Sequence, residues 1–123
     1  MKFKVNIHDC TPDSGLNTFE TLLRLKENNI VRDTFILFSP ENATRRLKVG
    51  YTVVYPKCRT NGHSHANEEE IYLVTWGRGL AQVGEEKFIV SAGDCFYVAP
   101  GLFHSVENCT NEPLHYVWAI AQI

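Results

Sequence analysis

The stretch GHSHANEEEIYLVTWGRG, residues 62–79, decides how this chain can fold and what it can bind. It places His63 and His65 one residue apart, then three consecutive glutamates, then an apolar run closed by two glycines. Because residues i and i+2 of a strand point to the same face, the two imidazoles can reach one point. The stretch therefore predicts a pair of converging histidines followed by a strand.

The apolar run after the glutamates alternates with the period of a half-exposed strand. This alternation places Glu70 and Tyr72 on one face and Ile71 on the other. Gly77 and Gly79 then permit a tight exit from the strand. We therefore expect Tyr72 to point in the same direction as Glu70.

The composition fits one domain, residues 1–123, with 44% hydrophobic and 21% charged residues. The formal net charge of −2 gives no general attraction to nucleic acid or to an acidic membrane surface, so we expect neither partner. The four cysteines form no CxxC pair, and the first ten residues lack the apolar core of a signal peptide. We therefore expect a cytoplasmic protein with reduced thiols.

Residues 1–32 are predicted to form a strand and a short helix ahead of the main body. Residues 3–7 alternate between apolar and polar side chains, as in a half-buried strand at a sheet edge. Asn17 and Glu20 form a capping box that starts the helix, and Asn28 ends it. The main body then covers about residues 33–123.

The main body is predicted to consist of short β-strands separated by Gly, Pro and Asn turns. Many short strands with only one early helix indicate an all-β sandwich or barrel of the jelly-roll kind. The strands are expected near residues 33–38, 46–55, 70–76, 80–84, 86–90, 95–99, 103–108 and 114–121.

A second stretch, GDCFYVAPGLFHSVEN at residues 93–108, contains one more histidine for the same point. Its Pro100-Gly101 turn separates two strand segments, so a hairpin returns His104 across the sheet. Three neutral imidazoles and one carboxylate suit a divalent first-row transition metal, with about two positions left for water, substrate or oxygen. Iron, manganese, nickel and zinc all remain open as the metal.

The two stretches resemble the cupin family, whose motifs are G-x5-HxH-x3,4-E-x6-G and G-x5-PxG-x2-H-x3-N. The ligand positions of these motifs fall on His63, His65, Glu70 and His104. The position of Gly77 selects Glu70 over Glu68 and Glu69 as the carboxylate ligand. The resemblance implies a double-stranded β-helix, or jelly-roll barrel, with one divalent metal. It also implies a homodimer, with residues 2–8 as a candidate for pairing between subunits.

Two motif positions depart from the family pattern, and neither is a ligand. Ala99 stands at the proline position, with Pro100 after it, and Lys57 stands where a glycine is expected. A finer resemblance relates TNGHSH and EIYLVTWGRG to the cupin-type phosphoglucose isomerases, although the spacing between His65 and Glu70 is shorter here. This finer resemblance points to sugar chemistry.

Two residues beside the ligands, Tyr72 and Glu69, are candidates for a catalytic role. The Tyr72 hydroxyl can orient a substrate oxygen or move a proton, and the alternative is a packed aromatic residue. Glu69 can act as a general base beside the metal, and the alternative is a solvated carboxylate, as for Glu68.

Four further polar residues are given structural interpretations. Arg45, Arg46 and Lys48 begin a strand, where a solvated edge is favoured over contact with an anionic substrate. Asn108 is expected to fix the turn that closes the second motif.

Two classes of function remain. The first is an enzyme whose metal polarises a carbonyl or hydroxyl of a small polar metabolite, with sugar or sugar-phosphate isomerisation first. The same ligand set also suits a ferrous dioxygenase or a decarboxylase. The second class is a non-catalytic barrel that binds a metal or a metabolite. The enzyme is the favoured hypothesis.

Overall fold

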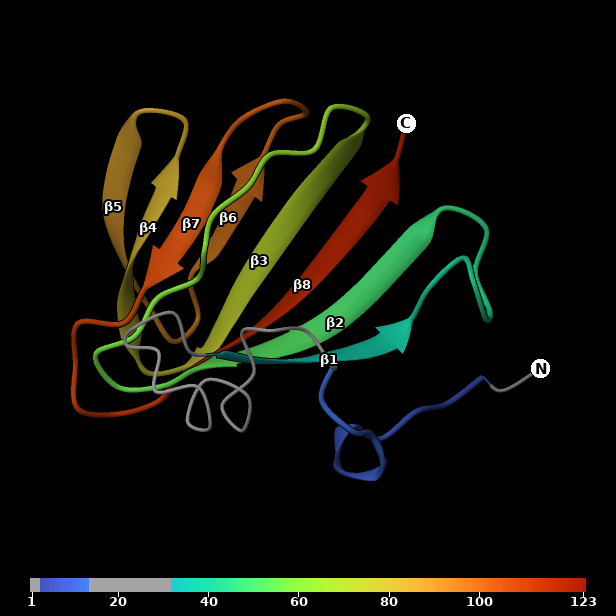
Figure 1. The fold of residues 1–123 in the computed structure, drawn as a ribbon, viewed down its shortest axis with the longest axis horizontal. Coiled ribbons are helices and arrows are strands. Elements are labelled where there is room, and N and C mark those ends of the chain that lie inside the picture. The colour runs from blue at the N-terminus through green and yellow to red at the C-terminus, as the bar shows by residue number, and fades with distance from the viewer. Residues whose placement is uncertain (1–2, 14–31) are drawn as a thin grey trace.

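The computed structural model describes residues 3–13 and 32–123, and nearly all of their regular structure is β (Figure 1). Each strand predicted for the main body is found, with small shifts at its ends. The elements are η1 (Ile7–Asp9), β1 (Arg32–Phe38), β2 (Leu47–Val54), β3 (Glu68–Trp76), β4 (Arg78–Val83), β5 (Glu86–Ser91), β6 (Cys95–Val98), β7 (His104–Glu107) and β8 (Leu114–Gln122).

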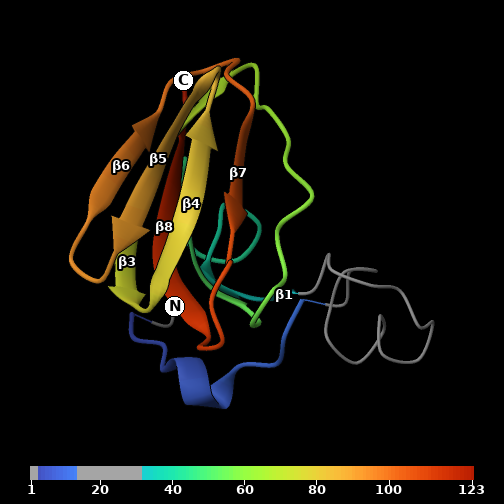
Figure 2. The same ribbon diagram turned by 90° about the vertical axis from the view of Figure 1, so that its left-hand side faces the viewer.

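The described strands form two antiparallel sheets. One has five strands in the order β1-β2-β8-β3-β6, and the other has three in the order β5-β4-β7. Figure 2 shows the smaller sheet in front of the larger one, so the two sheets make a layered jelly roll. The strand order is not the chain order: β8 lies between β2 and β3, and β7 pairs with β4. The all-β jelly-roll prediction is confirmed.

The core lies between the sheets and follows the strand alternation. In β8 every second residue from Leu114 to Ile120 is buried, and the residues between them are partly exposed. Gly50 on β2 faces Trp118, and a Cβ atom at position 50 would lie 2.0 Å from the indole ring. The buried apolar residues are Val54, Tyr72, Val74, Ala81, Val90, Val98, Val106, Leu114, Tyr116, Trp118 and Ile120.

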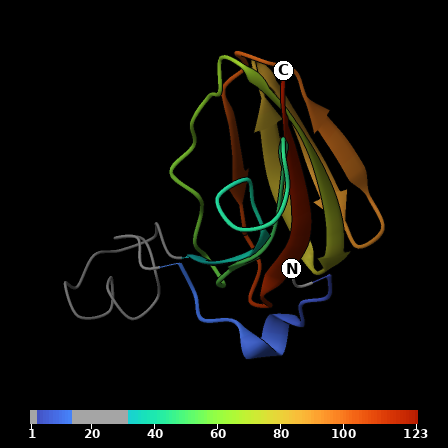
Figure 3. The ribbon, with the colours of Figure 1, turned by 90° about the vertical axis from the view of Figure 1, so that its right-hand side faces the viewer.

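The segment between β2 and β3 runs beside β7 and carries the two motif histidines (Figures 2 and 3). The backbone N–H of His63 donates to the carbonyl of His104 at 3.1 Å, and the N–H of His104 donates back at 2.9 Å. The N–H of Thr60 donates to the carbonyl of Val106 at 2.9 Å. Although this segment forms only isolated bridges and no regular strand, it brings the two histidine-containing stretches side by side.

The expected N-terminal strand over residues 3–7 is wrong. Residues Ile7–Asp9 form a 3-10 turn instead, and the Asn6 side chain accepts a hydrogen bond from the N–H of His8 at 2.9 Å. An Asn side chain that bonds the backbone two residues further along competes with pairing in a sheet, which explains the difference. The helix expected over residues 17–28 lies outside the described residues. Within the described ranges, no helix has the length and apolar character needed to cross a membrane.

Candidate metal centre

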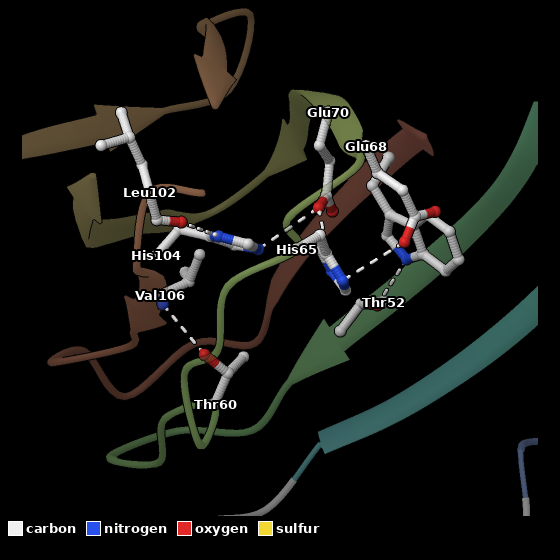
Figure 4. A network of polar contacts seen from close by, with 9 residues as sticks. Thr52, Thr60, His65, Glu68, Glu70, Leu102, His104 and Val106 are labelled. Atoms are coloured by element: carbon white, nitrogen blue, oxygen red, sulfur yellow. Dashed lines mark hydrogen bonds and ion pairs between the residues drawn. The ribbon is translucent and has the colours of Figure 1, made fainter. Parts of the chain in front are cut away.

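The structure brings all four predicted ligands together. One possible ligand atom from each of His63, His65, Glu70 and His104 lies within 4.8 Å of the others. Glu70 Oε2 is 3.2 Å from His104 Nε2 and 3.8 Å from His65 Nε2. Figure 4 shows His65, Glu70 and His104 pointing toward one another from three different segments. The cluster is therefore a product of the tertiary fold.

Three ligand atoms of this cluster are buried, and they have no hydrogen-bond partner in the described part of the chain. They are His65 Nε2, Glu70 Oε2 and His104 Nε2. Buried polar atoms are normally hydrogen-bonded, so three such atoms at one point need an explanation. For metal–ligand bonds of about 2.1 Å, neighbouring ligand atoms lie about 3.0–3.4 Å apart. The Glu70–His104 separation of 3.2 Å falls in this range, and the Glu70–His65 separation of 3.8 Å lies between it and the roughly 4.2 Å expected for ligands on opposite sides of one cation.

Two contacts around the cluster orient the imidazoles. His104 Nδ1 lies 3.1 Å from the Leu102 carbonyl, which can only accept, so the proton belongs on Nδ1 and leaves the Nε2 lone pair free. His65 Nδ1 lies 3.4 Å from Glu68 Oε1 (Figure 4). A carboxylate behind a histidine ligand fixes the ring and makes it a stronger donor to metal.

Glu68 is a site residue that the sequence analysis assigned to solvent. Its side chain lies on the same face of β3 as Glu70 and reaches His65. Two signals were available: the even spacing from Glu70 along the strand, and the three-residue spacing from His65. The three-residue spacing alone does not predict the contact, because the sequence does not show that residues 63–67 turn back toward β3.

The electrostatics of the site act in opposite directions on two of its histidines. Burial, together with His104 and His65, lowers the pKa of His63. For His104, burial lowers the pKa, but the Glu70 carboxylate and the Leu102 carbonyl raise it more, and the pKa ends above its usual value. A bound cation would take the place of the proton that Glu70 favours on His104, so metal affinity should fall at acid pH.

Tyr72 lies inside the barrel next to the cluster. Its side chain is 6% exposed and stacks on Phe96 with ring centroids 4.6 Å apart. Its ring centroid is 6.0 Å from that of His104. Burial raises the pKa of Tyr72 well above its usual value, and Tyr116 and Glu70 add to this effect. Tyr72 is therefore both a packed aromatic and a hydroxyl beside the candidate metal centre, which combines the two interpretations.

Glu69 does not join the cluster. Strand alternation turns its side chain to the outer face of β3, where its carboxylate accepts a hydrogen bond from the Tyr97 hydroxyl at 2.8 Å. It faces away from Glu70 and Tyr72, which are buried on the inner face. The expectation that Glu69 acts as a base beside the metal therefore conflicts with where the structure places it.

Asn108, the last residue of the second motif, fixes the turn after β7 as expected. It is fully buried. Its Nδ2 donates to the carbonyl of Val54 at 3.0 Å and to that of Glu112 at 2.7 Å. Its Oδ1 accepts from the N–H of Thr110 at 3.0 Å. One side chain therefore ties the motif to β2 and to the start of β8.

A cavity of about 420 Å³ opens from the cluster toward β1 and β2. Besides the four ligands, its walls include Tyr72, Tyr116 and Trp118. Arg32 and Lys48 also line it. The prediction of a solvated edge thus holds for Arg45 and Arg46, which are exposed, but Lys48 turns inward.

Comparison with known families agrees with this geometry. The sequence pattern of the family described as "Cupin domain" matches residues 43–120, which include both motifs and the four clustered residues. This chain belongs to the cupin family. The match runs from the turn before β2 to the end of the buried part of β8, so it covers most of the described jelly roll.

The individual relatives support the fold of this chain but do not identify its reaction. An uncharacterized protein of Methanocaldococcus jannaschii is 46% identical over 52 residues, which make up 42% of this chain and 42% of that protein. A crystal structure from Thermotoga maritima, described as a predicted oxalate decarboxylase, has a TM-score of 0.82 and 22% identity, with 98% of this chain and 100% of that chain covered. A Cupin 2 conserved barrel domain protein from Salinispora arenicola has a TM-score of 0.69 and 20% identity, with 99% and 89% covered. At such identities the two structures support the cupin fold alone.

Proposed function

We propose that this cupin is a small metal-dependent enzyme that acts on a small polar metabolite. One observation carries the proposal: His65 Nε2, Glu70 Oε2 and His104 Nε2 are buried, converge, and have no hydrogen-bond partner within the described ranges. They stand at the wall of a cavity large enough for a metabolite. Together with His63 they would hold one divalent ion of iron, manganese, nickel or zinc.

The metal, when bound, would supply Lewis-acid polarisation of a carbonyl or hydroxyl oxygen. The raised pKa of Tyr72 keeps its hydroxyl protonated at neutral pH, so this side chain can donate a hydrogen bond but is a poor base. A donor held rigidly by stacking on Phe96 stabilises negative charge that develops on a substrate oxygen. Tyr72 is therefore assigned the role of donor to the reacting oxygen.

Isomerisation of a sugar or sugar phosphate is the reaction we put first. Such a reaction moves a hydrogen between adjacent carbons and develops negative charge on a substrate oxygen, which a hydrogen bond from Tyr72 would stabilise. The first-motif resemblance to cupin-type isomerases supports the same choice. The outward position of Glu69 removes it from this proposal as the proton acceptor.

Decarboxylation of a small carboxylic acid is the second candidate. A cationic side chain, Arg32, lines the same cavity as the cluster. The Thermotoga maritima structural relative described as a predicted oxalate decarboxylase shares this fold along nearly its whole length. The loss of carbon dioxide from a carboxylate also places negative charge on the remaining fragment, so the role of Tyr72 stays the same.

Elemental analysis of the untagged protein, purified without added metal, tests the centre. We expect about one equivalent of a transition metal per chain, because four ligands converge on one point. The double variant His63→Ala, His65→Ala should lose it, since two of the four donors are gone. A protein that takes up none of the four metals, even when each is supplied in excess, would contradict the proposal.

Turnover then tests the chemistry. Aldose and ketose phosphates and small carboxylic acids are offered to the metal-loaded protein, and Tyr72→Phe is compared with wild type. We expect kcat to fall by about a hundredfold in this variant while the metal content is unchanged, as when one donor to a developing oxyanion is removed. Full metal occupancy with no turnover of either class would favour the non-catalytic binding barrel instead.

A further inference from the structure

Arg32 presents an unused positive group inside the cavity. It is the first residue of β1, pairs with Val54 in register, and lines the same cavity as His63. Its Nη1 atom is buried and has no hydrogen-bond partner in the ranges that the structure describes. A buried guanidinium nitrogen without an acceptor is costly. The described residues supply no partner for this nitrogen, so a bound ligand is a candidate for that role.

Three neighbouring side chains on this wall are already hydrogen-bonded to one another. Thr34 and Thr52 lie with their hydroxyl oxygens 3.0 Å apart, and Trp118 Nε1 donates to Thr52 Oγ1 at 2.9 Å. Within the described ranges, no carboxylate lies at ion-pair distance from Arg32. Arg32 therefore differs from its neighbours: it is the charged side chain here that keeps a buried donor open.

The positive charge of Arg32 affects the pKa of Tyr116 inside the barrel. Burial is the main reason that the pKa of Tyr116 is raised, and Glu70 adds to it, whereas Arg32 acts in the opposite direction. Tyr116 belongs to β8 and Arg32 to β1, so the guanidinium influences a wall two strands away in the sheet.

The balance of charge around the cavity favours an anion. Arg32 and Lys48 are the cationic lining residues, and Asp13 and Glu70 are the acidic ones. Once a divalent cation is bound at the cluster, positive charge exceeds negative charge around the cavity. A neutral sugar would gain nothing from this excess, whereas an anion would.

We propose that Arg32 binds the carboxylate of a small organic acid whose second oxygen function faces the metal centre. The planar guanidinium fork matches a carboxylate with two parallel hydrogen bonds. This inference rests on the proposed metal-dependent enzyme and, of its two candidate reactions, deepens the decarboxylation of a small carboxylic acid, because it names the substrate class of the same cavity. A phosphate ester offers related oxyanion chemistry, and the experiment separates the two.

Calorimetric titration of the protein, both as purified with its metal and after metal removal, tests the inference. The probes are malate, glycerate, inorganic phosphate and neutral glycerol. We expect malate or glycerate to bind saturably and more tightly than phosphate, and glycerol not to bind. Arg32→Gln should weaken carboxylate binding about tenfold or more, because it removes a charge-assisted pair of hydrogen bonds worth at least about 1.4 kcal/mol. Arg32→Lys should recover part of the affinity, since the charge returns without the fork.

Arg46→Gln is the matched control, because Arg46 is an exposed arginine outside the cavity. Its carboxylate affinity should stay within about twofold of wild type, well below the tenfold step of a lost ion pair. The thermal midpoint of Arg32→Gln should not fall, because the substitution removes an unpaired buried charge. A lower midpoint would mean that Arg32 has a structural partner and would overturn the inference.

Three binding results would also overturn it: equal carboxylate affinity in Arg32→Gln and wild type, tighter binding of phosphate than of either acid, or equal binding of glycerol. Failure of the proposed function is a separate result. If the wild type takes up no metal but binds carboxylates in an Arg32-dependent way, the acid site stands and the metal chemistry falls. If Arg32→Gln keeps its metal but binds acids like wild type, only the acid site falls.

Discussion

Glu68 and Glu69 have the same chemistry but different surroundings, because successive residues of β3 point to opposite faces of the sheet. Glu68 lies on the inner side with Glu70 and contacts His65 Nδ1 at 3.4 Å. Glu69 lies on the outer side and accepts from Tyr97. One residue of shift along a strand turns a side chain to the other face. Side-chain position, more than residue type, decides which carboxylate can influence the centre.

Glu68→Gln should lower the affinity for metal by about tenfold, because it weakens the group that orients His65, and such outer contacts commonly change affinity by about 10–100-fold. Competition with a chromogenic chelator at pH 7.5 measures this affinity. Glu69→Gln is the matched control and should leave it unchanged, since Glu69 contacts Tyr97 on the far face. Equal losses in the two variants would show that the net negative charge, and not the contact with His65, matters.

At the scale of the element, β3 and β8 carry both the core and the centre. Each is nine residues long and alternates between buried and more exposed positions, and they pair antiparallel with Glu70 opposite Ile120. A β-bulge or irregularity between Val74 and Trp76 shifts the register of β3 against β8 before β3 ends. Gly77 follows at once, so the exit from β3 combines a bulge with a residue in a positive-φ conformation.

Gly77→Ala should destabilise the fold strongly. The φ angle of Gly77 is +85°, and an added Cβ would lie 2.4 Å from the backbone carbonyl oxygen of Pro113. The conformation alone costs about 1–2 kcal/mol for a residue other than glycine, and the contact with rigid backbone adds to it. Urea unfolding measures the free energy.

Gly93→Ala separates the two effects. Gly93 also has a positive φ, +96°, but an added Cβ would meet nothing within 4 Å. The Gly93→Ala variant should lose only about 1–2 kcal/mol of unfolding free energy, which is the conformational cost alone. If Gly77→Ala is no more destabilised than Gly93→Ala, the close approach of the turn before β8 to Gly77 is not a constraint on the fold.

At the scale of the whole molecule, the larger sheet carries several exposed apolar side chains on its outer face. Leu47, Ile71, Leu73 and Tyr97 are 43–51% exposed and lie on this face, with Trp76 near its end at 59%. At about 200 Å² for a large side chain, half-exposed residues of this number present on the order of 500 Å² of surface. This is a large part of the roughly 800 Å² that each partner buries in a standard interface.

We propose that a second copy of this chain covers the face, which gives the homodimer expected from the family resemblance. Light scattering after gel filtration should show a dimer for wild type and a monomer for Ile71→Lys, because a buried unpaired charge at an interface is unfavourable. Ile89→Lys is the control: Ile89 is 62% exposed but belongs to β5 of the smaller sheet. A monomeric wild type, or loss of the dimer only in Ile89→Lys, would place the interface elsewhere or exclude it.

Much of this protein was determined by the sequence alone. The alternation of apolar residues predicted the strands, because strand period and burial are local properties. The motif spacing predicted the four clustered residues, since a cupin barrel returns its second motif to the first. The prediction failed at residues 3–7, where the Asn6 side chain accepts a hydrogen bond from the backbone N–H of His8.

Only the tertiary structure decided what surrounds the four ligands. Arg32 and Lys48 enter the cavity because β1 pairs with β2 and β2 pairs with β8, an arrangement that no local pattern contains. Glu68 reaches His65 because the segment before β3 runs beside β7 and then turns back. Such contacts join residues far apart in the chain, and their geometry depends on how the two sheets close around the cavity. For this reason the candidate metal ligands could be predicted from sequence, whereas the candidate substrate contacts could not.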